Sequence, residues 1–181
     1  FVAGIVIAFS PELAASLGTP GVTAARAVLC SYLGVAIGDL LCGLLSQWLQ
    51  SRRRAMMLSL SLLLIGLLVL LRLRGLSPNG FYLLGFGLGV STGYWAVLVT
   101  TAAEQFGTNL RATVTTSIPN LVRASVIPLS LLYQQLLPSL GTIETVRLIG
   151  LGTVALAALA LWSLPETYHR ELAFVERDST S

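Results

Sequence analysis

Long apolar runs separated by short polar segments dominate this chain. At 1.5 Å per helical residue, about 20 residues cross the roughly 30 Å hydrocarbon core of a bilayer. The apolar runs predict membrane-spanning helices over residues 21–49, 55–71, 81–103, 112–137 and 143–164. The apolar segment 1–9 covers only about half of a span, so we expect it to be the outer end of a truncated helix.

The polar segments between these runs carry the residues that end helices. Proline, glycine, serine and asparagine gather in them, and proline interrupts a helix because it lacks an N–H donor. These segments lie at residues 10–11, 18–20, 77–80 and 138–141, and Pro165 follows the last helix. Because every connection is short, we expect one transmembrane domain over residues 1–165 and a polar, cytoplasmic tail over residues 166–181.

The composition agrees with a membrane protein. Hydrophobic residues make up 55% of the chain and charged residues 10%, whereas soluble domains carry about 25% charged residues. The sequence therefore predicts an all-α, multi-pass protein of the cell (inner) membrane, in contact with lipid. The net charge of +3 comes from arginine alone and is spread over the loops, which gives no reason to expect a nucleic-acid partner.

The arginines indicate which helix ends face the cytoplasm, because cytoplasmic loops carry an excess of positive charge. The three arginines of the loop 52–54 are placed inside on this rule. The other inside arginines are then Arg111, Arg170 and Arg177, and the outside ones are Arg72 and Arg74. The first three helices and the last three run in opposite senses in this topology. We therefore predict a six-helix bundle of two inverted three-helix repeats, which is typical of secondary transporters.

Two charged residues fall within predicted spans, where a charge is costly and usually functional. Arg123 lies about 18 Å from Arg111 by helical rise, near the middle of the membrane. It belongs to a polar stripe with Asn120, and such a stripe is expected to face a wet cavity or another helix. We interpret Asn120 and Arg123 as contacts for an anionic group of a solute, or Arg123 as the counter-charge of Asp39. The alternative is a structural ion pair or a polar helix contact.

Asp39 is the second intramembrane charge, and it shares a helix face with Tyr32 seven residues earlier. A carboxyl group within a span can take up and release a proton, so Asp39 is a candidate proton-coupling site. Tyr32 is a candidate solute contact on the same face. The alternative for Asp39 is polar packing at the inner end of a cavity.

Glycines recur at every fourth residue in the predicted helix 81–103, at Gly85, Gly89 and Gly93. Such small-residue faces let membrane helices approach closely. Trp95 is expected on the opposite face of this helix, which can line a cavity. Trp95 and its neighbour Tyr94 are therefore candidate aromatic contacts for a solute. The alternative is that they anchor the helix at the membrane interface.

The same stretch spells G-x-S-x-G around Ser91, the pattern of the nucleophile elbow in serine hydrolases. That elbow needs a strand-to-helix turn and a base. Here the pattern lies in a predicted membrane helix, and the only histidine, His169, is in the tail. We therefore expect no enzyme, no metal site and no cofactor.

The polar segment 104–111 separates two predicted helices with an acid and an arginine at its ends. A solvated local ion pair between Glu104 and Arg111 is one reading, and it would contribute little stability. A second polar segment, from Gly43 to the arginines 52–54, separates the preceding pair of helices. Both segments carry charge at the mouths of membrane spans, which suggests a gate.

Together these segments resemble the C-terminal half of the major facilitator superfamily. Gly43, Gln47, Arg52 and Arg53 match the loop G-x-x-x-D-R-x-G-x-R-R, with Gln47 in place of the Asp. Residues 104–111 resemble the segment E-x-F-P-T-x-x-R of the sugar porter and metabolite–proton symporter branches, with Gly107 in place of the Pro. The end of the last helix, L-P-E-T at 164–167, is similar to the same motif in those branches.

The resemblance implies a secondary active transporter that moves a small solute by alternating access, with proton coupling. It implies that Glu104, Arg111, Arg52 and Arg53 hold helix ends together when the inside gate is closed. The partners would be the solute and the N-terminal half of the same transporter, absent here. With Arg123 in the path, we expect an organic anion or a polar metabolite. The alternatives are a non-transporting scaffold or receptor on the same fold, and a six-span intramembrane enzyme.

Overall fold

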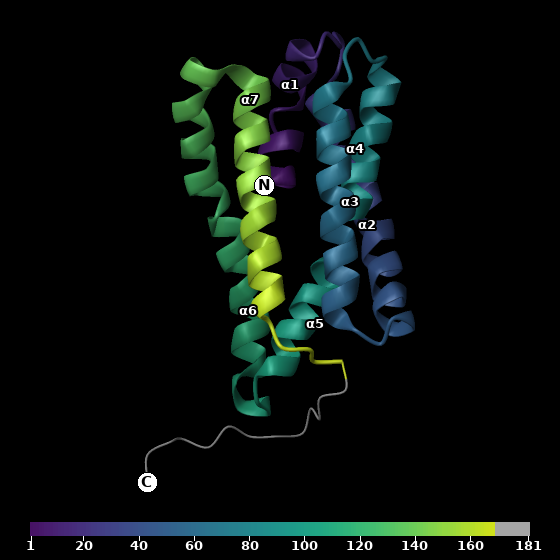
Figure 1. Ribbon diagram of the computed structural model, residues 1–181, viewed down its shortest axis with the longest axis vertical. Helices are drawn as coiled ribbons and strands as arrows, with labels where there is room; N and C mark the ends of the chain where they lie inside the picture. The colour runs from purple at the N-terminus through teal and green to yellow at the C-terminus, as the bar shows by residue number, and fades with distance from the viewer. Residues whose placement is uncertain (169–181) are drawn as a thin grey trace.

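The computed structural model describes residues 1–168, and these are helical apart from short connections. The remaining predicted tail, with His169, Arg170 and Arg177, lies outside the described residues. The helices run up and down along the long axis of the molecule (Figure 1). In chain order they are η1 (Val2–Ile7), α1 (Ser10–Ser16), α2 (Ala24–Trp48), α3 (Arg52–Arg72), α4 (Pro78–Thr92), α5 (Trp95–Gln105), α6 (Thr108–Ala124) and α7 (Val126–Ser163).

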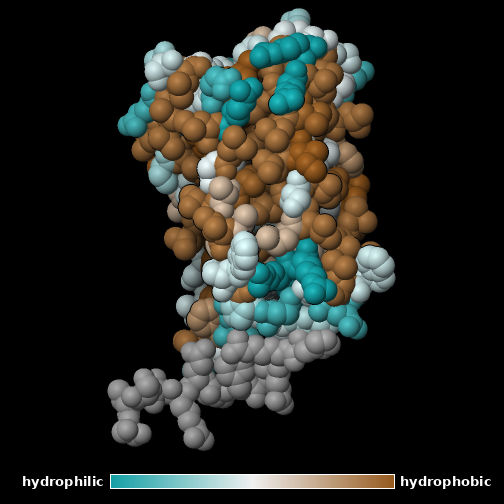
Figure 2. All heavy atoms as spheres, in the orientation of Figure 1, coloured by the Kyte–Doolittle hydropathy of each residue, from teal (hydrophilic) through white to brown (hydrophobic). Residues whose placement is uncertain are grey.

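Several of these helices are long and apolar enough to cross a bilayer. Within residues 1–168 the qualifying stretches are Ala24–Trp48, Arg52–Arg72, Pro78–Gln105 and Thr108–Ser163. The last stretch reverses direction at Gly141, whose φ of 73° lies in the left-handed region (Figure 1). The face of the molecule in Figure 2 is mostly apolar along its middle, with hydrophilic residues gathered toward its two ends. The predicted all-α chain with helices able to span a membrane is confirmed.

Two of the predicted helices contain a break. The run 112–137 is divided at Ser125 between α6 and α7. Pro128 explains this break, because proline lacks the N–H that would bond to the Ala124 carbonyl and its ring clashes with that carbonyl. The run 81–103 is divided at Gly93 and Tyr94, between α4 and α5.

The N-terminal segment differs from expectation in its local structure. Residues 2–7 form a π-helical turn, and Ile5 and Val6 on it are buried. We expected a turn at residues 10–11, but Pro11 instead lies in the first turn of α1. Proline is tolerated there because the N–H groups of a first helical turn have no partner within the helix.

The closest packing in the bundle is between α2 and α4. A Cβ atom added at Gly89 would overlap the Ser31 carbonyl oxygen, and one added at Gly93 would overlap the backbone of Gly38. Conversely, a Cβ atom at Gly38 would overlap the Val90 carbonyl oxygen. The predicted glycine face of α4 is confirmed, and its partner is the small-residue face of α2.

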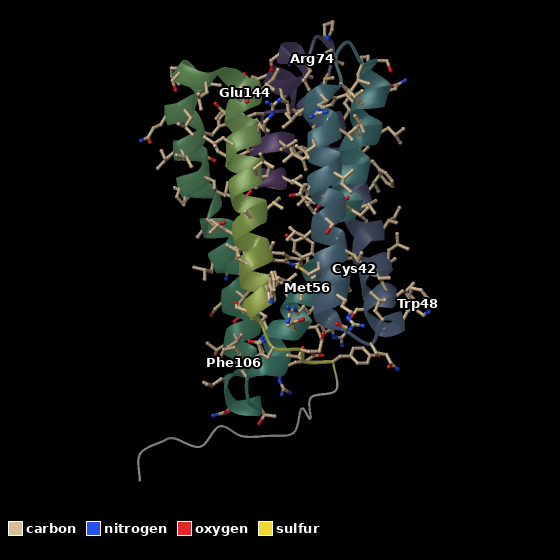
Figure 3. All side chains as sticks on the ribbon, viewed as in Figure 1. Cys42, Trp48, Met56, Arg74, Phe106 and Glu144 are labelled. Carbon is tan, nitrogen blue, oxygen red and sulfur yellow. The ribbon has the colours of Figure 1, made fainter. Side chains whose placement is uncertain are left out.

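The buried side chains form two clusters along the bundle. The larger one joins η1, α1, α2, α3, α4 and α7, and Phe9 stacks on Tyr133 with ring centroids 4.8 Å apart. The smaller one joins α2, α3, α5 and α7, and its buried members are Cys42, Ala55, Met56, Val97 and Leu161. Cys42 and Met56 lie on the side of the molecule where Phe106 marks the end, opposite Arg74 and Glu144 (Figure 3). The smaller cluster therefore underlies the end at which the polar segments meet.

Candidate functional site

Four segments meet at this end of the bundle. They are the C-terminal end of α2, the first turn of α3, the last turn of α5 and the residues that follow α7. Their polar side chains form one group, which we call the Arg52–Glu104 cluster: Ser46, Ser51, Arg52, Glu104, Glu166, Thr167 and Tyr168.

A buried ion pair lies at the centre of the Arg52–Glu104 cluster. Arg52 Nη2 lies 3.0 Å from Glu104 Oε1, and Glu104 is only 7% exposed. The other carboxylate oxygen, Oε2, accepts a hydrogen bond of 2.6 Å from the Thr167 hydroxyl. Arg52 Nη1 donates to the Ser46 hydroxyl at 3.1 Å. A buried carboxylate is tolerated only when it is paired and hydrogen-bonded, and both oxygens of Glu104 meet this condition.

The helical period of α5 explains why Glu104 points inward. Val97, Thr101 and Glu104 are all buried and follow one face at the spacing i, i+4, i+7. Val97 packs in the smaller core cluster. The apolar packing of α5 therefore turns Glu104 toward α3.

The Arg52 guanidinium is also covered by an aromatic ring. Its central carbon lies 5.2 Å from the centroid of the Tyr168 ring, a cation–π arrangement. The Tyr168 hydroxyl donates to the Gln47 carbonyl oxygen at 3.3 Å. Arg52 Nε is buried and has no hydrogen-bond partner among the described residues. Tyr168 thus closes the cluster from outside and ties it to the end of α2.

Glu166 caps the first turn of α3. Its carboxylate accepts hydrogen bonds from the Ser51 hydroxyl and from the backbone N–H groups of Arg52, at 2.9 Å, and Arg53, at 3.4 Å. Carboxylates are stabilising near helix N-termini because they satisfy free N–H groups and complement the helix dipole. Partial burial raises the pKa of Glu166, but these hydrogen bonds outweigh it and the net pKa is lowered.

Glu166→Gln is expected to remove an acid-sensitive part of the stability. The folded-state pKa of Glu166 lies below its unfolded value of about 4.3. The carboxylate therefore contributes stability above that value, and the contribution is lost as the pH falls through the lower folded-state pKa. In thermal unfolding, the difference between wild type and Glu166→Gln should be constant near neutral pH and shrink below about pH 4. A difference that stays the same down to the acid limit of folding would contradict this assignment.

Arg111 and Arg53 take positions beside the ion pair. Arg111 Nε donates to the Ala103 carbonyl oxygen at 3.0 Å, and Arg111 Nη2 donates to that of Phe106 at 3.3 Å. These bonds satisfy carbonyls at the C-terminal end of α5, where positive charge is favourable. The side chain of Arg53 lines a shallow depression with Glu166. The local Glu104–Arg111 pair considered from the sequence is replaced by the long-range pair of Glu104 with Arg52.

The three aromatic candidates lie together. Tyr32, Tyr94 and Trp95 line one half-open cavity of about 240 Å³ between α2, α3, the α4–α5 junction and α7. Thr92 and Thr153 add hydroxyl groups, and the rest of the lining is apolar. No charged side chain contributes to it among the residues that the structure describes.

The polar candidates on α6 lie elsewhere. Asn120 and Arg123 are both exposed, and Arg123 Nη1 donates to Asn120 Oδ1 at 3.3 Å. Neither residue lines the aromatic cavity. No residue of α6 is buried. The structure therefore divides the predicted solute contacts into an aromatic group around one half-open cavity, with Tyr32 exposed at it, and an exposed polar pair on α6.

Asp39 is half-buried, and its carboxylate binds backbone rather than an arginine. Asp39 Oδ1 accepts a hydrogen bond of 3.1 Å from the N–H of Ala96 in the first turn of α5. The Asp39–Arg123 pair considered from the sequence is not formed in this structure, since Arg123 donates to Asn120.

Sequence reasoning missed the roles of Glu166, Thr167 and Tyr168. Residues 164–167 were noted only as a motif. The signal that could have found them is Pro165, which keeps the preceding residue, Leu164, out of the helical conformation and so ends α7 at this end of the bundle. Leu164 is indeed extended, with ψ of 134°.

Within residues 1–168 there is no group of three or more His, Cys, Asp or Glu residues that could hold a metal ion. No protein-family model matches this chain, and no curated protein or solved structure matches it significantly.

Proposed function

We propose that this chain is the C-terminal half of a secondary transporter of the major facilitator type, which moves a small solute by alternating access. The observation that carries the proposal is the Arg52–Glu104 cluster. At one end of an apolar bundle, it joins the ends of α2, α3 and α5 to the residues after α7 around a largely buried ion pair. Such a pair contributes little net stability relative to apolar packing, but it specifies one arrangement of the helices. A contact with that property suits a gate that must open as a unit.

The end of the bundle with the Arg52–Glu104 cluster would face the cytoplasm, because the three consecutive arginines 52–54 lie there and cytoplasmic ends carry an excess of positive charge. In this proposal the six predicted spans form two inverted repeats, with α4 and α5 counted as one span. The reversal at Gly141 separates the last two spans. The tail that begins after α7 would then lie in the cytoplasm, where Thr167 and Tyr168 close the gate.

The solute would be an organic anion or a polar metabolite. Tyr32, Tyr94 and Trp95 would contact its apolar part, and Arg123 with Asn120 its anionic or polar group. Tyr32 is 58% exposed on α2, and Arg123 is exposed on α6. These surfaces would face the N-terminal half of the transporter, with the solute path between the halves.

The test is uptake by the full-length protein in proteoliposomes, with a panel of organic anions, polar metabolites and sugars, with and without a proton gradient. Arg123→Ala is expected to reduce uptake of an anionic solute. Arg147→Ala is the matched control, because Arg147 is a partly exposed arginine whose ion pair with Glu144 lies at the opposite end of the bundle. Binding of a solute without flux would favour a receptor or scaffold.

Asp39→Asn is expected to abolish proton-driven accumulation while sparing solute exchange. The amide keeps an oxygen that can accept the Ala96 hydrogen bond, but it cannot bind and release a proton. The measurement is pH-dependent accumulation against counterflow exchange in the same vesicles. Unchanged pH-dependent accumulation would remove Asp39 from the coupling mechanism.

The enzyme alternative gains no support from Ser91. Its hydroxyl donates to the Gly87 carbonyl oxygen at 2.9 Å, an ordinary contact within a helix.

A further inference from the structure

The break between α4 and α5 leaves a helix N-terminus partway along the bundle. Gly93 has φ −73° and ψ 40°, and Tyr94 has φ −100° and ψ 7°, so neither continues the helix. Tyr94 occupies the cap position of α5, and its side chain makes no capping hydrogen bond. Free N–H groups at such an end cost free energy where no water reaches them.

Asp39 of α2 supplies the missing cap from another helix. The N–H that it accepts belongs to Ala96, the second residue of α5, which is one of the positions that a capping side chain normally satisfies. The backbone of α2 is held at this point, because Gly93 lies directly against the backbone of Gly38 and Asp39. The carboxylate is therefore positioned by the glycine contact between α2 and α4.

The other end of α5 carries Glu104. Glu104 lies eight positions after Ala96, a distance of about 12 Å along a helix. Between them, Val97 and Thr101 are buried on the face that also holds Glu104. Because α5 is packed along this face, a displacement of its first turn would also move the Glu104 carboxylate, which binds Arg52 and Thr167.

We infer that Asp39 is a positioning residue for the Arg52–Glu104 cluster and acts on it through α5. The inference rests on the proposed function, in which that cluster is the gate. It gives the candidate proton-coupling residue a physical route to the gate. Protonation removes the charge that complements the N-terminus of α5 and weakens the cap. The titratable neighbours are the Cys42 thiol on α2, within electrostatic range of Asp39, and the Tyr94 hydroxyl beside Cys42.

The experiment compares Asp39→Ala with Asp39→Asn in the full-length protein in lipid nanodiscs, by hydrogen–deuterium exchange. Asp39→Ala removes the cap, so exchange in residues 95–98 should rise about tenfold. Exchange should also rise in residues 102–106, around Glu104. Asp39→Asn keeps an acceptor oxygen but loses the charge, as protonation does, so exchange should rise at both ends by a smaller factor of up to about threefold. Asp39→Ser, whose shorter side chain does not reach Ala96, replaces Asp39→Ala if that variant fails to fold.

Thr100→Ala is the matched control on α5. Thr100 is exposed, and its hydroxyl bonds only within the helix, to the Ala96 carbonyl oxygen. This variant should leave exchange at both ends unchanged. The inference is overturned if Asp39→Ala loosens residues 95–98 alone, or if Asp39→Asn loosens α5 as much as Asp39→Ala.

Transport separates this inference from the proposed function. Asp39→Asn should keep solute exchange, whereas Asp39→Ala should lose exchange and accumulation together, because the gate is mispositioned. If the wild type transports a solute but loosening of residues 95–98 does not raise exchange in residues 102–106, only the inference about Asp39 is overturned. If exchange rises at both ends of α5 in Asp39→Ala but the wild type transports no solute, the transport proposal is overturned and the structural role of Asp39 stays in place.

Discussion

Gly89→Ala is expected to lower the free energy of unfolding by about 3 kcal/mol, at the upper end of the range for overpacking. The new methyl group would overlap the Ser31 carbonyl oxygen, which is backbone of α2. A flexible side chain could rotate away, but a helix backbone moves only if the whole helix shifts. Because α2 and α4 interlock along several glycines, separation at Gly89 also weakens the contacts of Gly38 and Gly93.

The matched control for this prediction is Gly87→Ala on the same helix. A Cβ atom at Gly87 meets nothing within 4 Å, and the residue is exposed. Alanine in a helix interior is favoured over glycine by about 0.5–1 kcal/mol, so this variant should be as stable as wild type or slightly more stable. The measurement is thermal unfolding in detergent, followed by circular dichroism. Equal stability of the two variants would show that α2 and α4 do not interlock.

Glu104→Ala is expected to destabilise the bundle by about 3 kcal/mol, because it leaves the Arg52 guanidinium desolvated without its counter-charge. Arg52 also loses its link through Glu104 to Thr167, so the residues after α7 should detach from α5. The control is Glu144→Ala, which breaks an exposed ion pair with Arg147. Exposed pairs contribute about 0–1 kcal/mol, so the two variants should differ clearly.

A double-mutant cycle with Arg52→Ala separates the ion pair from the loss of the individual side chains. The double variant should be less destabilised than the sum of the two single variants, since neither charge is then left unpaired. Additive losses would mean that Arg52 and Glu104 stabilise the bundle independently. In that case the cluster would not act as a unit.

The sequence-based prediction was strongest where composition alone decides the structure. Apolar runs of about 20 residues have few stable arrangements other than membrane helices, and the turn residues between them marked most boundaries. The helix break at Ser125 follows from Pro128, which cannot continue a regular helix, whereas the break at Gly93–Tyr94 was missed. The N-terminus of α5 at that second break is capped by Asp39, which is more than 50 residues away in sequence, and no local sequence pattern predicts such a partner.

The pairing of charges was harder to predict than their location. Glu104 and Arg111 lie close in sequence, so a local pair was the simplest reading, whereas Glu104 pairs with Arg52 across 52 residues. The side-chain direction of Glu104 follows from the packing of Val97 and Thr101, which depends on α2, α3 and α7. In the same way, Arg123 shares a stripe with Asn120 by helical period, but the period does not say which helix covers that stripe.

The exposed helix α6 has a consequence for the way the chain enters a membrane. Its apolar content is low. Arg123 lies near the middle of the leg that runs from Thr108 to Gly141, and an arginine near the centre of a span opposes insertion by about 2.5–3.5 kcal/mol. The leg of α7 after Gly141 is almost entirely apolar between Leu148 and Leu161. The tight reversal at Gly141 joins the unfavourable segment to the favourable one as a helical hairpin. We therefore expect the hairpin, rather than the single helix, to partition into lipid as one unit, so that insertion of α6 follows synthesis of the residues after Gly141.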